Sequence, residues 1–284
     1  MGVCVGTFVA QNGNSTPTSV ACLKKVSSNL SCMPNLNQIQ AIFQAYSPRI
    51  YFHPDEEYLS SSVSWFFNNG ALLYKKGEES NPVPVEPTGS NLLQGGSNDG
   101  EYWLDLPVDK KPKRESRKEI YKKLRIGEHV GDWEHLTLRI SNFNGELWSV
   151  YFSQHSGGSW FNASELEFEN GNKAVCYASL HGHAMYSKPG LVLQGSSRIG
   201  IRNDTSKSKI VLDTGARFSV VAAEYLGTAI IEPPWLNYLR KWGPTVSYDV
   251  SVFQKFVKSL PNEVFGEEGP TGPKLKRNWI GDEV

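Results

Sequence analysis

Residues 131–155 read GDWEHLTLRISNFNGELWSVYFSQH, and this stretch decides the fold. Asn144-Gly145 is the strongest short-range signal for a β-hairpin, and alternating apolar residues flank it on both sides. A two-residue turn at this pair would place Glu134 directly opposite His155, at a distance where a carboxylate and an imidazole touch. The stretch therefore predicts two antiparallel strands with an acid and a histidine at their open end.

The alternation also assigns side chains to the two faces of the first strand. Glu134 shares a face with Leu136 and Leu138, while His135 and Thr137 point to the other side. A carboxylate on an apolar face is costly unless it has a polar partner. We therefore expect Glu134 to be paired within the fold or to belong to a site.

The rest of the chain favours many short strands joined by tight turns. It contains 8 Trp, 12 Tyr, 13 Phe, 26 Gly and 16 Pro. Further strands are expected at residues 49–52, 102–104, 173–180, 210–212 and 218–222. Helices are expected at residues 36–46 with Asn35 as N-cap, from Pro233 to Trp242, and at residues 252–260. These patterns predict a mainly β protein, an antiparallel β-sandwich-like domain with a few peripheral helices.

All 284 residues are predicted to form a single β-rich domain. Residues 110–125 hold nine basic residues against Glu115 and Glu119, so residues 107–127 are interpreted as a charged linker or junction. Alternatives are a patch for anionic lipid and a nuclear import signal. Residues 266–284 are expected to be an irregular tail.

Charge and hydropathy exclude several classes of protein. Lys plus Arg and Asp plus Glu number 29 each, so the net charge does not favour a nucleic-acid partner. No apolar run approaches the roughly 18 residues of a membrane span, and the N-terminus lacks the pattern of a secretory signal. The sequence therefore predicts a cytoplasmic protein with no transmembrane segment, whose 4 Cys are free thiols.

Histidines and carboxylates gather in three short stretches, residues 131–135, 154–158 and 181–183. Their position at the ends of predicted strands predicts a site there. Three readings remain open: a buried polar network, a metal-free acid/base pair and a divalent metal centre, such as zinc. The catalytic candidates are Glu134 and His155. The metal-ligand candidates are Asp132, His155, His181 and His183, with His53 in support. None of the sharp zinc signatures is present, and whether the protein is an enzyme is left open.

Six segments together resemble one known family. It is the plant family described as similar to vacuolar protein sorting-associated protein 62, a domain of unknown function. The matching segments are residues 51–55, 62–67, 69–74, 131–135, 151–155 and 266–270. Members of this family look roughly twice as long and carry more sheet sequence where this chain has residues 107–127. The resemblance therefore implies a shortened form of the family, with the basic stretch as a junction.

The resemblance implies a ligand-binding or vacuolar-trafficking-associated module. Such a module would be cytoplasmic and peripheral to the vacuolar or endosomal membrane. Its expected partners are an anionic lipid or a trafficking protein, and no nucleic acid. The alternative from the residues themselves is a metal-assisted or acid/base enzyme, a hydrolase or lyase, that uses the Glu and His cluster.

Overall fold

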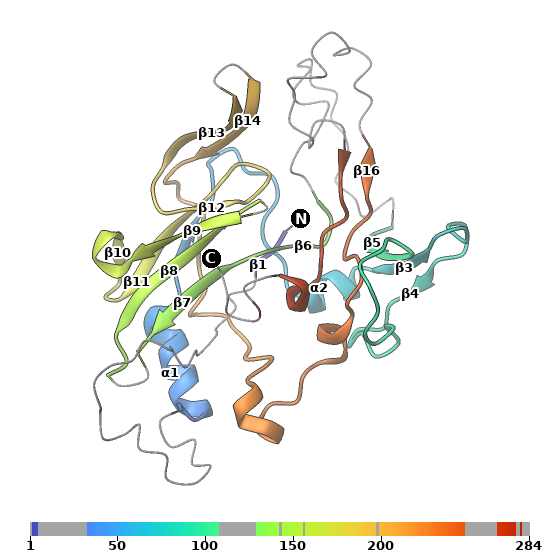
Figure 1. The fold of residues 1–284 in the computed structure, drawn as a ribbon, viewed down its shortest axis with the longest axis horizontal. Coiled ribbons are helices and arrows are strands. Elements are labelled where there is room, and N and C mark those ends of the chain that lie inside the picture. The colour runs from blue at the N-terminus through green and yellow to red at the C-terminus, as the bar shows by residue number, and fades with distance from the viewer. Residues whose placement is uncertain are drawn as a thin grey trace.

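The computed structural model describes residues 2–4, 33–107, 129–141, 144–155, 157–196, 199–247, 266–276 and 279 (Figure 1). The helix predicted at residues 252–260 lies outside the described residues. So does nearly all of the charged stretch at residues 107–127. The helices in the described part of the chain are too short or too polar to cross a bilayer.

The first sheet is built from the predicted hairpin and one further strand. β7 (Leu136–Ile140), β8 (Leu147–Gln154) and β9 (Gly157–Asn162) pair antiparallel in that order. The two strands predicted on either side of Asn144-Gly145 are therefore confirmed.

The predicted register of this hairpin is wrong. Leu138 pairs with Val150, one residue away from the partner that a two-residue turn would give it. The turn is wider than predicted, because the N–H of Ser141 donates to the carbonyl of Glu146. A bulge near the end of β7 shifts the register once more. Every facing pair is therefore displaced from its predicted position by at least one residue.

The second sheet has the order β10-β11-β2-β15, and β12 (Met185–Tyr186) also pairs with β11. Its strands are β10 (Phe168–Glu169), β11 (Lys173–Ala178), β2 (Arg49–Tyr51) and β15 (Val211–Asp213). β2 and β11 are parallel, whereas the other pairs in this sheet are antiparallel. The sheet is therefore mixed rather than purely antiparallel.

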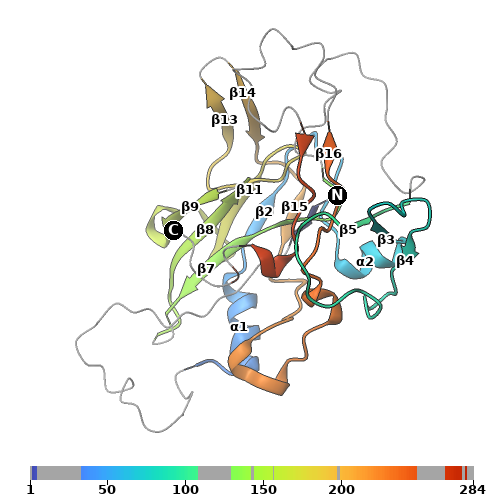
Figure 2. The same cartoon turned by 45° about the vertical axis from the view of Figure 1, so that its right-hand side comes forward.

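A hydrophobic core lies between these two sheets, which confirms the predicted sandwich (Figures 1 and 2). The buried side chains that form it are Ile50, Phe52, Leu136, Leu138, Val150, Phe152, Ala174, Cys176, Ala178 and Met185. Burial of this apolar surface is the main driving force for holding the sheets together.

A second core lies beside the sandwich, around α2 (Val63–Asn68) and a small sheet of order β4-β3-β5. These strands are β3 (Leu72–Lys75), β4 (Val83–Pro84) and β5 (Tyr102–Asp105). The core is rich in aromatic rings: Val63, Phe66, Phe67, Ala71, Val85, Leu92, Leu104, Leu106, Trp133, Tyr238 and Trp242. The short strand β6 (Asp132–Glu134) runs between the two cores and continues toward β7 (Figure 1).

The predicted helix α1 (Leu36–Tyr46) is confirmed with its cap. The side chain of Asn35 accepts from the N–H of Gln38, and the Gln38 side chain accepts from the N–H of Asn35.

Two other expectations, a strand and a helix, are wrong. Residues 218–222 form no strand, and the helix expected from Pro233 is only the 3₁₀ turn η5 (Pro234–Asn237). Backbone pairing of residues beyond η5 with distant segments ends that turn early.

Residues 266–276, the described part of the expected tail, contain two short elements. β17 (Gly266–Glu267) pairs with β16 (Val246–Ser247), and a 3₁₀ turn, η8 (Pro273–Leu275), follows. The N–H of Trp242 donates to the carbonyl of Pro270, which fixes this stretch against the second core. β1 (Gly2–Cys4) pairs in parallel with β6.

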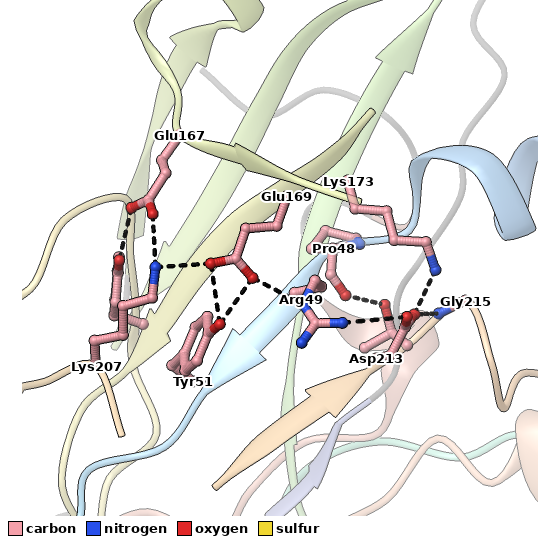
Figure 3. Close-up of polar contacts among 11 residues, drawn as sticks. Pro48, Arg49, Tyr51, Glu167, Glu169, Lys173, Lys207, Asp213 and Gly215 are labelled. Carbon is pink, nitrogen blue, oxygen red and sulfur yellow. Dashed lines mark hydrogen bonds and ion pairs between the residues drawn. The ribbon is translucent and has the colours of Figure 1, made fainter. Parts of the chain in front are cut away.

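An ion-pair network covers the outer face of the second sheet (Figure 3). Glu169 accepts hydrogen bonds from Arg49, Tyr51 and Lys207. Lys207 also donates to Glu167 at 2.8 Å. These contacts tie β10 to β2 and to the segment after β14 (Ile199–Thr205). The network is partly exposed and internally satisfied, so we interpret it as a stabilising surface feature.

Candidate functional site

The candidate site is built on β6, where the chain passes between the two cores. Trp133 is 2% exposed and its ring meets that of Trp242 edge-on, with centroids 4.9 Å apart. Asp132 and Glu134 point to the opposite face, because alternate residues of a strand share a face. Packing of Trp133 therefore fixes both carboxyl groups on one side of the strand.

Asp132 lies opposite a lysine from the C-terminal stretch. Its Oδ1 lies 3.6 Å from Nζ of Lys276, and the two side chains are 19% and 25% exposed. Burial alone would raise the pKa of Asp132. Electrostatic interactions with Lys276 and His129, together with the hydrogen bond from the N–H of Trp133, nevertheless bring that pKa below its usual value. The ionised form of Asp132 is therefore favoured.

The pKa of Glu134 is shifted in the opposite direction. Burial raises its pKa well above the usual value, and the negative charge of Asp132 raises it further. The positive charge of Lys276 and a hydrogen bond from Ser153 Oγ to Oε2 at 3.2 Å offset only part of this effect. Two neighbouring carboxyl groups whose pKa values move apart are a pattern common at functional sites.

The pKa values of two neighbouring groups are shifted in the direction that favours their neutral forms. Burial, followed by the charge of Lys276, lowers the pKa of His135 to about 3. Burial and the charge of Glu134 raise the pKa of Tyr186 to about 12. We call Asp132, Glu134, Ser153 and Lys276 the junction cluster. The lowered pKa of Asp132 favours its anionic form and the raised pKa of Glu134 favours its neutral form, with a neutral His135 beside them.

A second polar cluster surrounds Glu56, whose side chain is fully buried. Nε2 of His183 lies 3.1 Å from Oε2 of Glu56, and the N–H groups of His181 and Tyr58 donate to the carboxylate at 2.7 and 2.8 Å. Burial alone would raise the pKa of Glu56, but the two histidines and the Tyr58 N–H lower it well below the usual value. We call Glu56, His181 and His183 the histidine cluster.

The third histidine of the predicted site has a different partner. Nε2 of His155 lies 2.9 Å from Oδ1 of Asn203. His155, His181 and His183 all have positive φ, at 49°, 65° and 53°. Residues other than glycine seldom adopt this backbone conformation, which is found most often in turns and at functional sites.

The structure divides the predicted site residues between separate contacts. The predicted opposition of Glu134 and His155 is wrong, because Ser153 donates to Glu134 while His155 contacts Asn203. The residues predicted to bind a metal are also divided: Asp132 lies by Lys276, whereas His181 and His183 share Glu56. His53 Nδ1 accepts from the N–H of Asp55.

The described ranges also contain no group of three or more His, Cys, Asp or Glu side chains placed to hold a metal ion. The histidines and Asp132 therefore give no geometric support for the expected zinc centre.

Three partners of the predicted site residues were not themselves predicted from the sequence. Glu56 follows a turn and is adjacent to an exposed glutamate, so nothing in the local pattern marks it as buried. Lys276 belongs to a short basic run that resembles a solvated tail. Asn203 lies on β14, far along the chain from His155. Each is brought to its partner by tertiary contacts, which local periodicity does not encode.

Comparison with known families gives one clear result. The family model described as vacuolar protein sorting-associated protein 62 (Vps62) matches residues 1–123 and residues 120–283. The two matched stretches meet inside the basic segment that follows Pro107. No curated protein and no solved structure gives a significant match. Since the family model covers nearly the whole chain, the protein belongs to the Vps62 family.

Proposed function

We propose that this chain is a ligand-binding module associated with vacuolar sorting, and that it acts at the cytoplasmic surface of the vacuolar or endosomal membrane. Membership of the Vps62 family supports the association with sorting. The expected partners are an anionic lipid surface or a trafficking protein. The ligand site that we propose is the junction cluster.

The observation that carries this proposal is the opposite shift of two carboxyl pKa values on one strand face. The pKa of Asp132 is lowered and the pKa of Glu134 is raised. A protonated carboxyl group donates and accepts hydrogen bonds, a carboxylate only accepts, and the ammonium of Lys276 only donates. Together they complement a polar ligand that both donates and accepts hydrogen bonds.

The geometry leaves hydrogen-bonding capacity in the cluster. The 3.6 Å between Asp132 Oδ1 and Lys276 Nζ is longer than a direct hydrogen bond, and both side chains are partly exposed. Packing of Trp133 holds the strand in place on its other face, so the carboxyl groups are preorganised. Preorganised, partly exposed polar groups are typical of ligand sites.

An enzymatic role receives no comparable support. The acid/base pair expected from the sequence required Glu134 and His155 to be in contact, and they have different partners. We therefore propose binding and no reaction.

Native mass spectrometry of the protein isolated from its own cells tests the ligand site. The wild-type chain is expected to carry a bound small molecule that the Asp132→Asn and Glu134→Gln variants lose. Glu101→Gln, an exposed carboxylate outside the cluster, is the matched control and keeps the ligand. Equal ligand occupancy in all four proteins would contradict the assignment.

A cellular assay tests the sorting role. Depletion of the chain is expected to divert a vacuolar hydrolase into the medium. The wild-type chain and Glu101→Gln restore its delivery, whereas Glu134→Gln does not. Normal delivery of the hydrolase in depleted cells would contradict the proposed function.

A further inference from the structure

β13 (Gly190–Ser196) and β14 (Ile199–Thr205) form a two-stranded sheet of their own. In both views this hairpin projects from the end of the sandwich (Figures 1 and 2). β14 is the partner of β13 among the strands that the structure describes.

Three consecutive apolar side chains of β13 are open to solvent. Leu191, Val192 and Leu193 are 49%, 41% and 57% exposed. Because successive side chains of a strand alternate, Leu191 and Leu193 lie on one face of the hairpin and Val192 lies on the other. A flat protein partner would cover one face and leave the other in water, whereas a lipid interface surrounds both.

The charges of the hairpin complement an anionic surface. Residues 188–205 contain Lys188, Arg198 and Arg202 against one acidic residue, Asp204. The side chain of Arg202 is 65% exposed, and its contact with Asp204 at 3.2 Å is an exposed ion pair of little strength. Basic residues next to exposed apolar ones favour binding to anionic bilayers.

The base of the hairpin is fixed to the body. Asn203 and Thr205 are 2% and 6% exposed, and Asn203 contacts His155. The N–H of Leu180 donates to the carbonyl of Asp204 at 2.9 Å. The hydroxyl of Thr205 donates to the carbonyl of Lys188 at 3.2 Å. These contacts hold the exposed part of β13 away from the sandwich.

We propose that the β13–β14 hairpin is a membrane-contact element that places Leu191, Val192 and Leu193 in the interfacial region of an anionic bilayer. The contact is shallow, because an open two-stranded sheet has unpaired backbone groups that the hydrocarbon core does not accept. This inference goes beyond the proposed ligand site and does not depend on it.

Vesicle flotation tests the proposal with the full chain. The wild-type protein is expected to float with phosphatidylcholine–phosphatidylserine vesicles and to float less with phosphatidylcholine alone. The triple variant Leu191→Thr, Val192→Thr, Leu193→Thr keeps β propensity and is expected to bind about tenfold more weakly. The matched control is Leu59→Thr, Val83→Thr, Ile231→Thr, which removes three exposed apolar side chains outside the hairpin and floats like wild type.

Hydrogen exchange gives a second readout that does not depend on a variant. Vesicles are expected to slow exchange in residues 190–205 of the wild-type chain.

Equal flotation of the hairpin variant and the wild type would overturn the proposal, as would a wild-type chain that does not bind anionic vesicles. Dimerisation without vesicles that the hairpin variant abolishes would also overturn it, by making a second copy the partner. Normal flotation of Glu134→Gln is expected, which separates this test from that of the ligand site.

Discussion

Nε2 of His183 lies 3.1 Å from Oε2 of Glu56, and neither side chain is more than 2% exposed. The ring of His183 also meets the ring of Phe52 edge-on, with centroids 5.3 Å apart. The pair thus fastens the turn before β12 to the end of β2, beside the core of the sandwich. A buried carboxylate is tolerated at this position because several donors surround it.

Glu56→Gln is expected to destabilise the fold by about 3 kcal/mol, because the amide replaces an acceptor oxygen with a donor among N–H groups. Urea denaturation measures the change. Glu57→Gln is the control, since Glu57 is adjacent in sequence and exposed, and it is expected to stay within about 0.5 kcal/mol of wild type. Equal stability of the two variants would mean that the buried cluster contributes nothing.

The same cluster predicts a pH dependence. The pKa of Glu56 is lower in the folded state than in the unfolded chain, where it is about 4.3. Its contribution is therefore present above pH about 4.3 and is lost as the pH falls toward the folded value. The stability difference between wild type and Glu56→Gln is expected to shrink as acid is added. A difference that is constant from neutral to acidic pH would contradict this assignment.

His135 predicts a second acid effect. Its pKa falls to about 3 in the folded protein, so below pH about 6.5 the unfolded chain binds a proton that the folded protein does not. Stability is then lost as the pH falls from about 6.5 toward 3, by no more than about 1.4 kcal/mol per pH unit.

His135→Phe is expected to flatten this part of the profile. It retains a ring for the stack on Tyr151, where the centroids are 5.9 Å apart. Thermal unfolding at several pH values measures the effect. Parallel profiles for the two proteins would show that His135 is protonated equally in both states.

Gly131 controls how β6 enters the site. Its φ is +73°, and a Cβ there would come within 2.0 Å of the carbonyl oxygen of Trp242. Gly145 has the same φ of +73° with nothing within 4 Å of a Cβ. Gly145→Ala is expected to cost about 1 kcal/mol for its backbone conformation alone. Gly131→Ala adds the clash and is expected to cost about 3 kcal/mol or more, as measured by urea denaturation. Similar losses in both variants would show that the close approach is unimportant.

Local signals in the sequence were sufficient for part of the fold. The reciprocal cap of Asn35 and Gln38 marks the start of α1, and Asn144-Gly145 marks the turn of the hairpin. The register could not be predicted, because a wider turn and a bulge are alternatives that the same residues permit.

The candidate site was only partly predictable. Glu134 was identified because a carboxyl group on an apolar strand face is unusual, and Asp132 because it lies in a stretch where carboxylates and histidines gather. Their partner Lys276 was not identified, and neither was Glu56, the partner of two predicted histidines. Those contacts join segments that are distant in sequence, and many carboxylates and lysines of this chain would have satisfied the same local pattern.

The central claim is that Glu134 keeps its proton beside an ionised Asp132. Infrared difference spectroscopy of wild type against Glu134→Gln at about pH 5.5 tests it most directly, since an ordinary glutamate is about nine-tenths ionised there. The account predicts a protonated-carboxyl band in wild type that is lost in Glu134→Gln and kept in Glu57→Gln. Absence of that band from wild type, or its persistence in Glu134→Gln, would contradict the claim.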